Sequence, residues 1–556
     1  MSILNSRFIK LLIAGYGQEG ARILAAAVAA GLLQAGALII VNAAAEHFDA
    51  DSLNFRYFAL FALCIVGFAL ANRYAFTRTC QRAGQMIYDT QLRIADKVRR
   101  SDLRSFESLE RTDVYKVLLE HTDVLFEGAR YLTISASSLI MLIASFTYIA
   151  FISMPALIIC CVMIVAAVAV HQGTQKRINQ KLVQAKQRET DFLRHLNNLV
   201  DGFKEVKISR ARSEDLFENH LRMSSVAART AKVESEHLAI NNYIFAQTFF
   251  LILIAAIVFV LPRLGDVKGE DVSSVITVVL FTLGPLGQVV AMLPFIYKAE
   301  FALDSIETME NKLEQADDVK DTLEKSPLPA GEFGRIDLRA VSFRYQAGNG
   351  SGFRLGPLDL AINRGEILFI VGGNGSGKST LLKLITGLYY PTAGTVYLDN
   401  YAVDQAAYAH YRDFFTIIFS DFHLFDRLYG LRDVDEALVE ELLETMQLKG
   451  QTAYADGRFS NINLSSGQRR RLALITTYIE NKPIFVFDEV AADLDPQFRR
   501  YFYEQYLPSL KAQGKTVVAV SHDDRFFHLA DRVVKLEYGE MVAAPPSAGP
   551  DQGQAG

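Results

Sequence analysis

The sequence has little cysteine and no excess of positive charge, and both absences narrow the class of protein. Its 556 residues include four cysteines, none with the spacing of a zinc site or a redox pair. Three of them, Cys64, Cys160 and Cys161, lie in apolar runs, which favours packing residues over a disulfide framework. The net charge of −5 gives no general signal for nucleic-acid binding.

Apolar residues dominate the first half of the chain, which favours a membrane protein. Hydrophobic residues make up 50% of the sequence and charged residues 21%, with a mean hydropathy of +0.16. The length indicates two or more domains. Six apolar stretches have membrane length or close to it, and buried core helices are the alternative interpretation. They are Ile23–Ala45, Tyr57–Asn72, Tyr131–Ser153, Pro155–Val170, Leu238–Leu261 and Ser273–Tyr297.

The placement of lysine and arginine predicts the orientation of these spans. The links after the second and fourth spans are basic, whereas the short link Glu46–Arg56 holds Glu46, Asp49 and Asp51 against Arg56 alone. The positive-inside rule then places the N-terminus, both long links and the C-terminal half in the cytoplasm. Polybasic loops that bind lipid are the alternative interpretation. The basic residues are Arg73, Arg78, Arg82, Arg93, Lys97, Arg99, Arg100 and Arg104 in the first link, and Lys176, Arg177, Lys181, Lys186, Arg188 and Arg194 in the second.

The N-terminal segment, residues 1 to about 19, carries Arg7 and Lys10 among apolar residues. This pattern predicts an interfacial helix that leads into the membrane. A cleavable signal peptide is the alternative, but no convincing small-residue cleavage site precedes a soluble domain.

Both long links are predicted to be helical and to extend beyond the bilayer, because their apolar residues recur at helical spacing. Each is interrupted near its middle, at Leu103–Leu109 followed by Thr112-Asp113, and at Val200–Lys207. We interpret the interruptions as short docking helices that meet the C-terminal half of the chain. Solvated bends are the alternative.

Polar residues inside the spans are few, and we interpret them as interhelical hydrogen-bonding groups, with the lining of a pathway as the alternative. In the sixth span, Gly284-Pro285 and Gly287 predict a kink or a close helix contact. This helix is therefore the candidate for a membrane helix that moves. The polar residues are Gln34, Asn42, Ser137, Ser138, Asn241, Asn242, Gln247 and Gln288.

A charged, proline-containing linker at Lys312–Phe333 separates the two halves of the chain. We place a transmembrane domain at residues 1–325 and a second domain at 326–543, whose strands begin at about Gly334. The remaining residues, 544–556, are rich in Pro, Gly, Ala, Ser and Gln, and we expect a disordered tail there.

The second domain contains a phosphate-binding P-loop. The pattern G-x-x-x-x-G-K-S/T lies between the apolar run Glu366–Ile370 and the start of a helix at Leu381–Thr386. Backbone N–H groups and the helix dipole there favour phosphate anions, Lys378 is expected to reach the β- and γ-phosphates, and Ser379 to bind Mg²⁺. A chance glycine turn is the alternative. The candidate nucleotide-binding residues are Gly372, Gly373, Asn374, Gly375, Ser376, Gly377, Lys378, Ser379 and Thr380.

Two further apolar strands end in candidate catalytic residues. Ile484–Asp488 ends in Asp488, which we expect to hold Mg²⁺ through water, and Glu489 is placed to polarise an attacking water. Val517–Ser521 leads to His522, a candidate contact for the γ-phosphate, with a purely structural histidine as the alternative. With Lys378, Glu489 and His522 form the predicted catalytic set.

The segment Leu464-Ser465-Ser466-Gly467-Gln468 resembles the signature loop of ATP-binding cassette (ABC) proteins. Six spans with long cytoplasmic links ahead of such a domain resemble an exporter half-transporter. The resemblance implies an all-α, six-helix transmembrane exporter domain followed by an α/β P-loop cassette. It also implies that Tyr345 stacks on adenine and that Ser465–Gln468 bind the ATP held by the P-loop of a second subunit. Leu494-Asp495 matches the loop that links the two ATP sites.

One position departs from the family pattern. Ser420 stands where the family usually has a glutamine that binds Mg²⁺ and reports to the membrane domain. A hydroxyl is shorter than a carboxamide, so Ser420 would reach the metal only through water or a shift of the loop. Asp421 is an alternative ligand.

Phe419–Asp426, together with Gly372–Gly375, Ala491–Asp493 and Ser521–Arg525, resembles the cyclic-peptide and siderophore exporter group, which includes exporters of pyoverdine precursor, syringomycin and microcin peptides. The resemblance implies a homodimeric exporter in the bacterial inner membrane that uses ATP and Mg²⁺. Membrane lipids and a peptide or siderophore-like cargo are the expected partners, and no nucleic acid is expected. A lipid or glycolipid flippase and a regulator that transports nothing are the alternatives.

Overall fold

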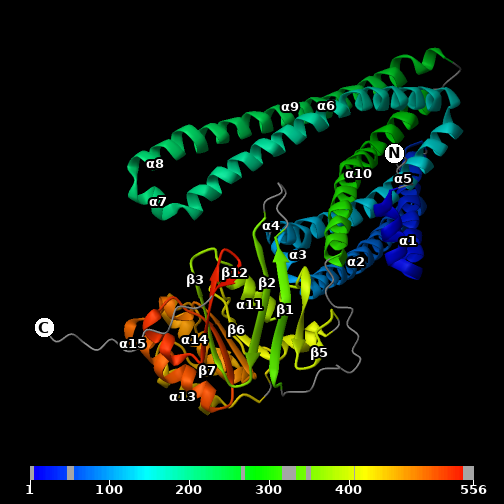
Figure 1. Cartoon of the computed structure of the whole chain (residues 1–556). Helices are drawn as coiled ribbons and strands as arrows, with labels where there is room; N and C mark the ends of the chain where they lie inside the picture. The colour runs from blue at the N-terminus through cyan, green and yellow to red at the C-terminus, as the bar shows by residue number, and fades with distance from the viewer. Residues whose placement is uncertain are drawn as a thin grey trace. The chain divides into compact units, whose positions relative to one another are not determined.

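The structure is a computed structural model that describes residues 6–46, 55–109, 111–264, 269–315, 333–345, 352–405, 407–431 and 433–542. The chain divides into two compact units (Figure 1). The first unit comprises Met1–Leu92 and Tyr115–Glu307, and the second comprises Arg93–Val114 and Thr308–Gly556. The predicted acidic link at 47–54, most of the linker at 316–332 and the tail at 544–556 lie outside the described residues.

The first unit is helical, and each of the six predicted spans lies on a long helix. Among the described residues, four helical stretches are long and apolar enough to cross a membrane: Arg7–Ala45, Phe55–Arg100, Asp113–Ile152 and Asp271–Glu314. The fourth and fifth predicted spans coincide with shorter apolar stretches, Met154–Ala167 and Gln247–Arg263, so their crossing stays a prediction. The helices are α1 (Arg7–Glu46), α2 (Phe55–Arg100), α4 (Arg111–Tyr115), α5 (Thr122–Ile152), α6 (Met154–Asp201), α7 (Phe203–Ile208), α8 (Arg210–Asp215), α9 (Arg222–Phe259) and α10 (Gly269–Gln315).

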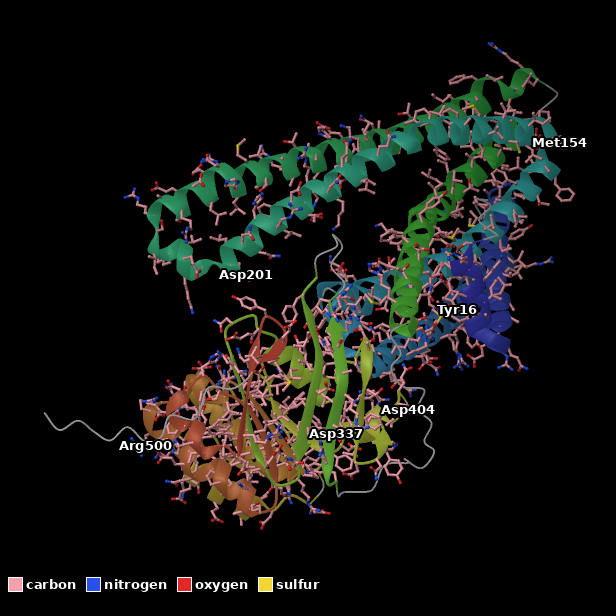
Figure 2. The ribbon with its side chains drawn as sticks, in the orientation of Figure 1. Tyr16, Met154, Asp201, Asp337, Asp404 and Arg500 are labelled. Atoms are coloured by element: carbon pink, nitrogen blue, oxygen red, sulfur yellow. The ribbon has the colours of Figure 1, made fainter. Side chains whose placement is uncertain are left out.

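The prediction that both long links are helical is confirmed, whereas their extension past a bilayer stays a prediction. Helix α6 has 48 residues, and at 1.5 Å per residue it is about 70 Å long, against roughly 30 Å for a hydrocarbon core. Figure 2 labels Met154 and Asp201 at its two ends, and α9 runs beside it. Both interruptions are short helices, α3 (Leu103–Glu107) and α7, as predicted.

Helix α1 is broken at Gly17, which has φ +52°, a left-handed value that glycine adopts without the strain a Cβ would bring. The piece before the break confirms a helix in the N-terminal segment, whereas its interfacial position stays a prediction. It is held to α10 by Arg7, whose guanidinium lies 3.1 Å from Asp304 and 3.0 Å from Glu307. Phe8 is fully buried, and its N–H donates to Glu300 at 3.1 Å.

For Asn42, Ser138 and Gln288, the prediction of hydrogen bonds between helices is confirmed, whereas Ser137 donates to a carbonyl of its own helix. Asn42 of α1 donates to the hydroxyl of Tyr148 of α5 at 3.0 Å, and Ser138 of α5 bonds the side chain of Gln288 of α10. The side chain of Asn242 lies outside the described residues. Among the described residues, a Cβ added at Gly284 or Gly287 would meet no atom within 4 Å, so the expected close helix contact is not found within one chain. Helix α10 is also continuous through Pro285.

The second unit is built on two sheets. A four-stranded antiparallel sheet has the order β2-β1-β4-β5, and a six-stranded sheet has the order β12-β11-β3-β10-β9-β6, parallel except for β12. The strands are β1 (Arg335–Arg344), β2 (Arg354–Asn363), β3 (Ile367–Gly372), β4 (Ala393–Leu398), β5 (Tyr401–Ala402), β6 (Phe415–Ile418), β9 (Ile484–Asp488), β10 (Thr516–Val520), β11 (Arg532–Glu537) and β12 (Glu540–Val542), with a small hairpin of β7 (Tyr454–Ala455) and β8 (Arg458–Phe459). The helices are α11 (Lys378–Ile385), α12 (Tyr408–Arg412), α13 (Glu436–Thr445), α14 (Ser466–Glu480), α15 (Pro496–Tyr501) and α16 (Leu507–Ala512).

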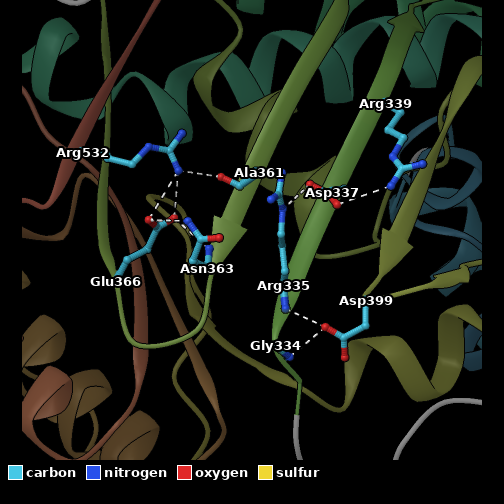
Figure 3. Close-up of polar contacts among 9 residues, drawn as sticks. All are labelled: Gly334, Arg335, Asp337, Arg339, Ala361, Asn363, Glu366, Asp399 and Arg532. Carbon is cyan, nitrogen blue, oxygen red and sulfur yellow. Dashed lines mark hydrogen bonds and ion pairs between the residues drawn. The ribbon is translucent and has the colours of Figure 1, made fainter.

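A polar cluster ties the two sheets together ahead of the P-loop (Figure 3). Arg532 of β11 donates to the carbonyl of Ala361 in β2 at 2.8 Å and pairs with Glu366 at 3.1 Å. Glu366 also accepts from the backbone N–H of Asn363 at 2.9 Å. Because Glu366 directly precedes β3, these bonds fix the point from which the strand enters the parallel sheet.

The parallel sheet brings the predicted site residues to one edge. Strands β9 and β10 are buried throughout, as is β3 up to its last residue, as expected for central parallel strands. In the register of the sheet, Val520 pairs with Ile370 on one side and with Asp488 on the other. The carboxyl ends of the three strands therefore meet, and this edge is where ligands bind in open α/β sheets.

Candidate functional site

The P-loop wraps from the end of β3 to the start of α11, as predicted. Gly377 has φ +103°, and a Cβ added there would lie 2.9 Å from the side chains of Leu355 and Phe353, so the turn requires glycine. The tip, Gly373–Gly375, is exposed. Lys378 is 5% exposed and donates to the carbonyls of Gly372 and Gly373 at 3.1 Å each, which holds its ammonium over the loop. The loop thus presents N–H groups and one cation to an anion.

Asp488 lies beside the start of α11 and is 1% exposed. Burial raises its pKa above the usual range, with help from the neighbouring charge of Glu489, while hydrogen bonds from the Ser379 side chain and the Ser420 backbone oppose the shift. Its Oδ1 is buried without a hydrogen-bond partner.

The carboxylate of Asp488 and the hydroxyl of Ser379 suit a magnesium ion. Mg²⁺ prefers oxygen ligands and is commonly bound by one or two protein groups plus substrate phosphates. The partnerless carboxylate oxygen and the adjoining Ser379 hydroxyl fit such a site. Among the described residues, no group of three His, Cys, Asp or Glu side chains is gathered to hold a metal alone. Ser420 is exposed and meets Asp488 through its backbone N–H, so a metal contact by its hydroxyl stays a prediction.

Glu489 stands between the other two predicted catalytic residues. Its Oε1 is 2.9 Å from Nε2 of His522 and 3.7 Å from Nζ of Lys378. Glu489 also has φ +53°, a left-handed conformation that is uncommon for a residue with a side chain. The structure therefore brings Lys378, Glu489 and His522 together at the edge of the sheet.

A cavity of about 290 Å³ lies next to His522 and is lined by Glu489, Tyr503, Ser521 and Arg525, among others. Arg525 holds the carboxylate of Asp523 with bonds of 2.8 and 2.7 Å, and this pairing keeps the pKa of Asp523 below its usual range. The hydroxyls of Tyr503 and Ser521 are 2.8 Å apart. These contacts anchor the backbone on either side of His522.

Tyr345 lies directly after β1, and its hydroxyl is 3.2 Å from Oγ1 of Thr380 in the P-loop. Its ring meets Phe343 edge to face at 5.2 Å and Tyr389 at 6.0 Å. The ring therefore lies beside the P-loop and packs against two aromatic side chains, and its stacking on adenine stays a prediction.

The loop Leu464–Gln468 leads into α14. Ser465 caps the helix: its hydroxyl accepts from the N–H of Gln468 at 3.4 Å, and its own N–H donates to the Gln468 side chain at 3.0 Å. Ser466 is exposed. Within the described part of the chain no hydrogen bond joins this loop to the P-loop, and binding of this loop to ATP on the P-loop of a second subunit stays a prediction.

Comparison with known proteins was made against family models, curated proteins and solved structures. The family model described as ABC transporter matches residues 355–492. The ATP-binding protein SyrD of Pseudomonas syringae pv. syringae is 36% identical over 367 residues, which cover 64% of this chain and 64% of SyrD. The energy-coupling factor transporter ATP-binding protein EcfA1 of Mycoplasma mobile is 31% identical over 222 residues, 38% of this chain and 79% of EcfA1.

The chain belongs to the ABC transporter family. Its match spans somewhat less than two thirds of the length of SyrD. A solved structure titled as a bacterial Atm1-family ABC exporter with ATP bound has the same fold, with a TM-score of 0.74 and 18% identity over 96% of this chain and 95% of that one. The predicted fold class, a helical membrane-type domain followed by an α/β cassette, is confirmed.

The cassette of this ABC transporter also carries the first docking helix, within the second unit. Glu107 at the end of α3 bonds Lys383 of α11 at 2.8 Å and accepts from the hydroxyl of Tyr389. Burial raises the pKa of Tyr389, and the hydrogen bond to Glu107 adds to the shift. Tyr389 in turn stacks on Phe343 at 4.8 Å. The prediction that this interruption docks on the cassette is confirmed, whereas docking by α7 stays a prediction.

Sequence reasoning missed Glu107, Lys383 and Tyr389 as individual residues. The one available signal was Lys383, a cation within the apolar run Leu381–Ile385. Its partner lies 276 positions away along the chain, so no local pattern identifies the pair.

Proposed function

We propose that the protein is an ATP-driven exporter of the bacterial inner membrane, working as a homodimer in which each chain supplies six membrane helices and one cassette. ATP and Mg²⁺ are the proposed cofactors. The observation that carries the proposal is the position of Glu489 beside both Lys378 of the P-loop and His522. A carboxylate with a purely structural role would not need to lie at the same edge of the sheet as the P-loop lysine and a histidine.

In the proposed reaction, Lys378 and the P-loop N–H groups bind the β- and γ-phosphates. Glu489 accepts a hydrogen bond from the attacking water and orients it, and His522 holds both Glu489 and a γ-phosphate oxygen. Ser379 and Asp488 would hold Mg²⁺, which neutralises charge on the transferred phosphoryl group. Catalysis by these residues is positioning plus electrostatic stabilisation.

The unpaired Leu464–Gln468 loop supports the homodimer. Because no hydrogen bond joins it to the P-loop among the described residues of its own chain, we propose that Ser466 and Gly467 of one chain bind ATP on the P-loop of the other. ATP then favours the closed pair of cassettes, and α3 and α7 pass this change to the membrane helices as an outward-open state. Hydrolysis resets the exporter. ATP shifts the dimer toward the closed state because the closed pair of cassettes has the higher affinity for ATP.

We propose a cyclic or modified peptide, lipopeptide or siderophore precursor as cargo. The support is the resemblance of Phe419–Asp426 and the related cassette segments to the cyclic-peptide and siderophore exporter group. These residues do not line a membrane cavity, so the cargo requires a direct test. A lipid or glycolipid flippase would carry the same catalytic residues.

The test is ATP hydrolysis by the full chain in proteoliposomes, with a cyclic lipopeptide, a hydroxamate siderophore precursor or lipid A added separately. Stimulation by either of the first two, with ATP-dependent uptake into inside-out vesicles, is the expected result. Stimulation by lipid A alone supports the flippase and overturns the cargo proposal. Absence of Mg²⁺-dependent hydrolysis under all conditions overturns the ATPase itself. The variant Lys378→Ala is the control for contaminating ATPases.

A further inference from the structure

Another cavity of the second unit, with a volume of about 380 Å³, is lined by three arginines. Arg344 is the last residue of β1, Arg354 is the first residue of β2, and Arg104 belongs to α3. The volume lies in the range of about 300–1,000 Å³ that is usual for small-molecule sites. The described residues that line the cavity include no acidic side chain and no member of the P-loop or the catalytic set. The others are Ser342, Phe343, Thr392 and Ala393.

The fold places the three cations close to one another. Arg344 and Arg354 are directly opposite in the register of the antiparallel pair, so their side chains share one face of the sheet. Like charges in opposite positions destabilise a sheet. The guanidinium carbon of Arg104 is 5.4 Å from the centre of the Phe343 ring, and its Nη2 is 3.5 Å from the carbonyl oxygen of Arg344. An anion between these groups would offset their mutual repulsion.

The protein supplies no carboxylate for this cluster in the part of the chain that the structure describes. None of the three guanidinium groups forms an ion pair there. The other arginines of β1 differ, because Arg335 and Arg339 lie 2.6 and 3.6 Å from the carboxylate of Asp337 (Figure 3). The loop sequence between β1 and β2, residues 346–351, contains no Asp or Glu. The cluster therefore differs from its neighbours on the same strand in having no counter-charge.

Ser342 adds a hydrogen-bond donor to the same cavity. It is only 8% exposed, and among the described residues its hydroxyl forms no hydrogen bond. Its backbone carbonyl is satisfied, since it accepts from the N–H and the hydroxyl of Thr392 at 2.8 and 2.9 Å. A buried hydroxyl without a partner is costly, and an anion in the cavity would accept its hydrogen bond.

We propose that Arg104, Arg344 and Arg354 bind a phosphate anion, with the hydroxyl of Ser342 as a further donor. The planar fork of a guanidinium matches two phosphate oxygens, and such bonds are strong because both partners are charged. Inorganic phosphate, a phosphate monoester and a lipid phosphate share this chemistry. The site is separate from the P-loop and does not depend on ATP hydrolysis. Because Arg104 belongs to α3, the bound anion also holds this helix to β1.

The first test is isothermal titration calorimetry with inorganic phosphate on the full chain in phosphatidylcholine nanodiscs. Every chain carries Lys378→Ala, so that the P-loop does not contribute. We expect saturable binding of one phosphate per chain, weakened about tenfold or more by Arg344→Gln or Arg354→Gln. Both side chains are exposed, so these variants should fold. Arg339→Gln removes the same charge from the same strand and, as the matched control, should leave the affinity unchanged.

The second test measures whether the anion holds α3. Hydrogen–deuterium exchange in the segment 101–109 should slow when phosphate is added, because a ligand that binds the docked helix stabilises it. Arg104→Gln should abolish this response. Nanodiscs that contain phosphatidylglycerol distinguish the sources of the anion. A lower affinity for phosphate in them assigns the site to a lipid headgroup, and an equal affinity assigns it to a soluble phosphate.

Absence of saturable phosphate binding overturns the proposal. Equal weakening by Arg339→Gln and Arg344→Gln also overturns it, because phosphate would then respond to general positive charge. Failure of the proposed function is separate, since the Lys378→Ala chains need no ATP hydrolysis for either readout. An unmodified chain that does not hydrolyse ATP would contradict only the exporter.

Discussion

At the scale of single residues, Ser420 is the clearest departure from the ABC pattern. Its backbone N–H bonds Asp488, and serine and glutamine provide that group equally. The chemical difference is therefore confined to the hydroxyl. If the hydroxyl contacts Mg²⁺ through water, its removal costs about 0.5–1 kcal/mol, as for an ordinary hydrogen bond.

We expect Ser420→Ala to raise the Mg²⁺ concentration needed for half-maximal ATP hydrolysis by about two- to fivefold, the equivalent of that free energy. We also expect stimulation by cargo to fall more than basal hydrolysis. The measurement is a Mg²⁺ titration of ATPase rate in proteoliposomes, with Asp421→Asn as the companion variant. An unchanged titration for Ser420→Ala and a shifted one for Asp421→Asn would assign the metal contact to Asp421 instead.

At the scale of elements, a few specific contacts hold helix α3 in place. Asp102 caps its start by accepting from the N–H of Ser105 at 2.8 Å, and Glu107 holds its end to Lys383 and Tyr389. A helix of five residues has little stability of its own, so these contacts decide whether it forms. Tyr389 also contacts the ring of Tyr345, with the ring centroids 6.0 Å apart, so the predicted adenine contact lies next to the side chains that hold the docking helix.

We expect Tyr389→Phe to loosen α3 while the aromatic stack on Phe343 remains. Loss of one hydrogen bond to a charged group costs roughly 1.5–3 kcal/mol, which should raise amide exchange in the segment 101–109 by about tenfold or more. Hydrogen–deuterium exchange with mass spectrometry measures this, and Tyr538→Phe, at a side chain that is 94% exposed, is the control. Equal exchange in both variants would show that Tyr389 does not seat the helix.

At the scale of the whole molecule, the proposed ATP site is shared between two chains. The described residues of one chain bring Lys378, Asp488, Glu489 and His522 together, and among them no hydrogen bond joins the Leu464–Gln468 loop to the P-loop. A site completed by a second copy would make ATP a ligand of the dimer, and ATP binding would then be linked to assembly of the cassettes.

We expect Glu489→Gln to bind ATP and to lose turnover by roughly 10²–10⁴-fold, the usual contribution of a general base. Two ATP molecules should then stay bound per pair of chains after gel filtration. Nucleotide content and light scattering of the eluted protein measure both. Elution of a monomer that retains one ATP would contradict the shared site. The variant Lys378→Ala should retain no ATP.

The sequence by itself determined the membrane-type helices, the parallel strands and the P-loop, because these depend on local apolar patterns and on glycines at fixed spacing. It also located the short helices at residues 103–107 and 203–208, since breaks in helical periodicity are local. Only the tertiary structure decided that Glu107 binds Lys383 and Tyr389 and that Arg470 donates to the backbone carbonyl of Glu489. It also decided that, among the described residues, Gly284 and Gly287 meet no close neighbour. Those contacts join residues far apart in sequence, and a side chain's partners follow from packing that no local pattern records. The P-loop pattern needed only the eight consecutive residues Gly372–Ser379 to be recognised, whereas the contacts of the docking helix α3 with Lys383 and Tyr389 needed the fold.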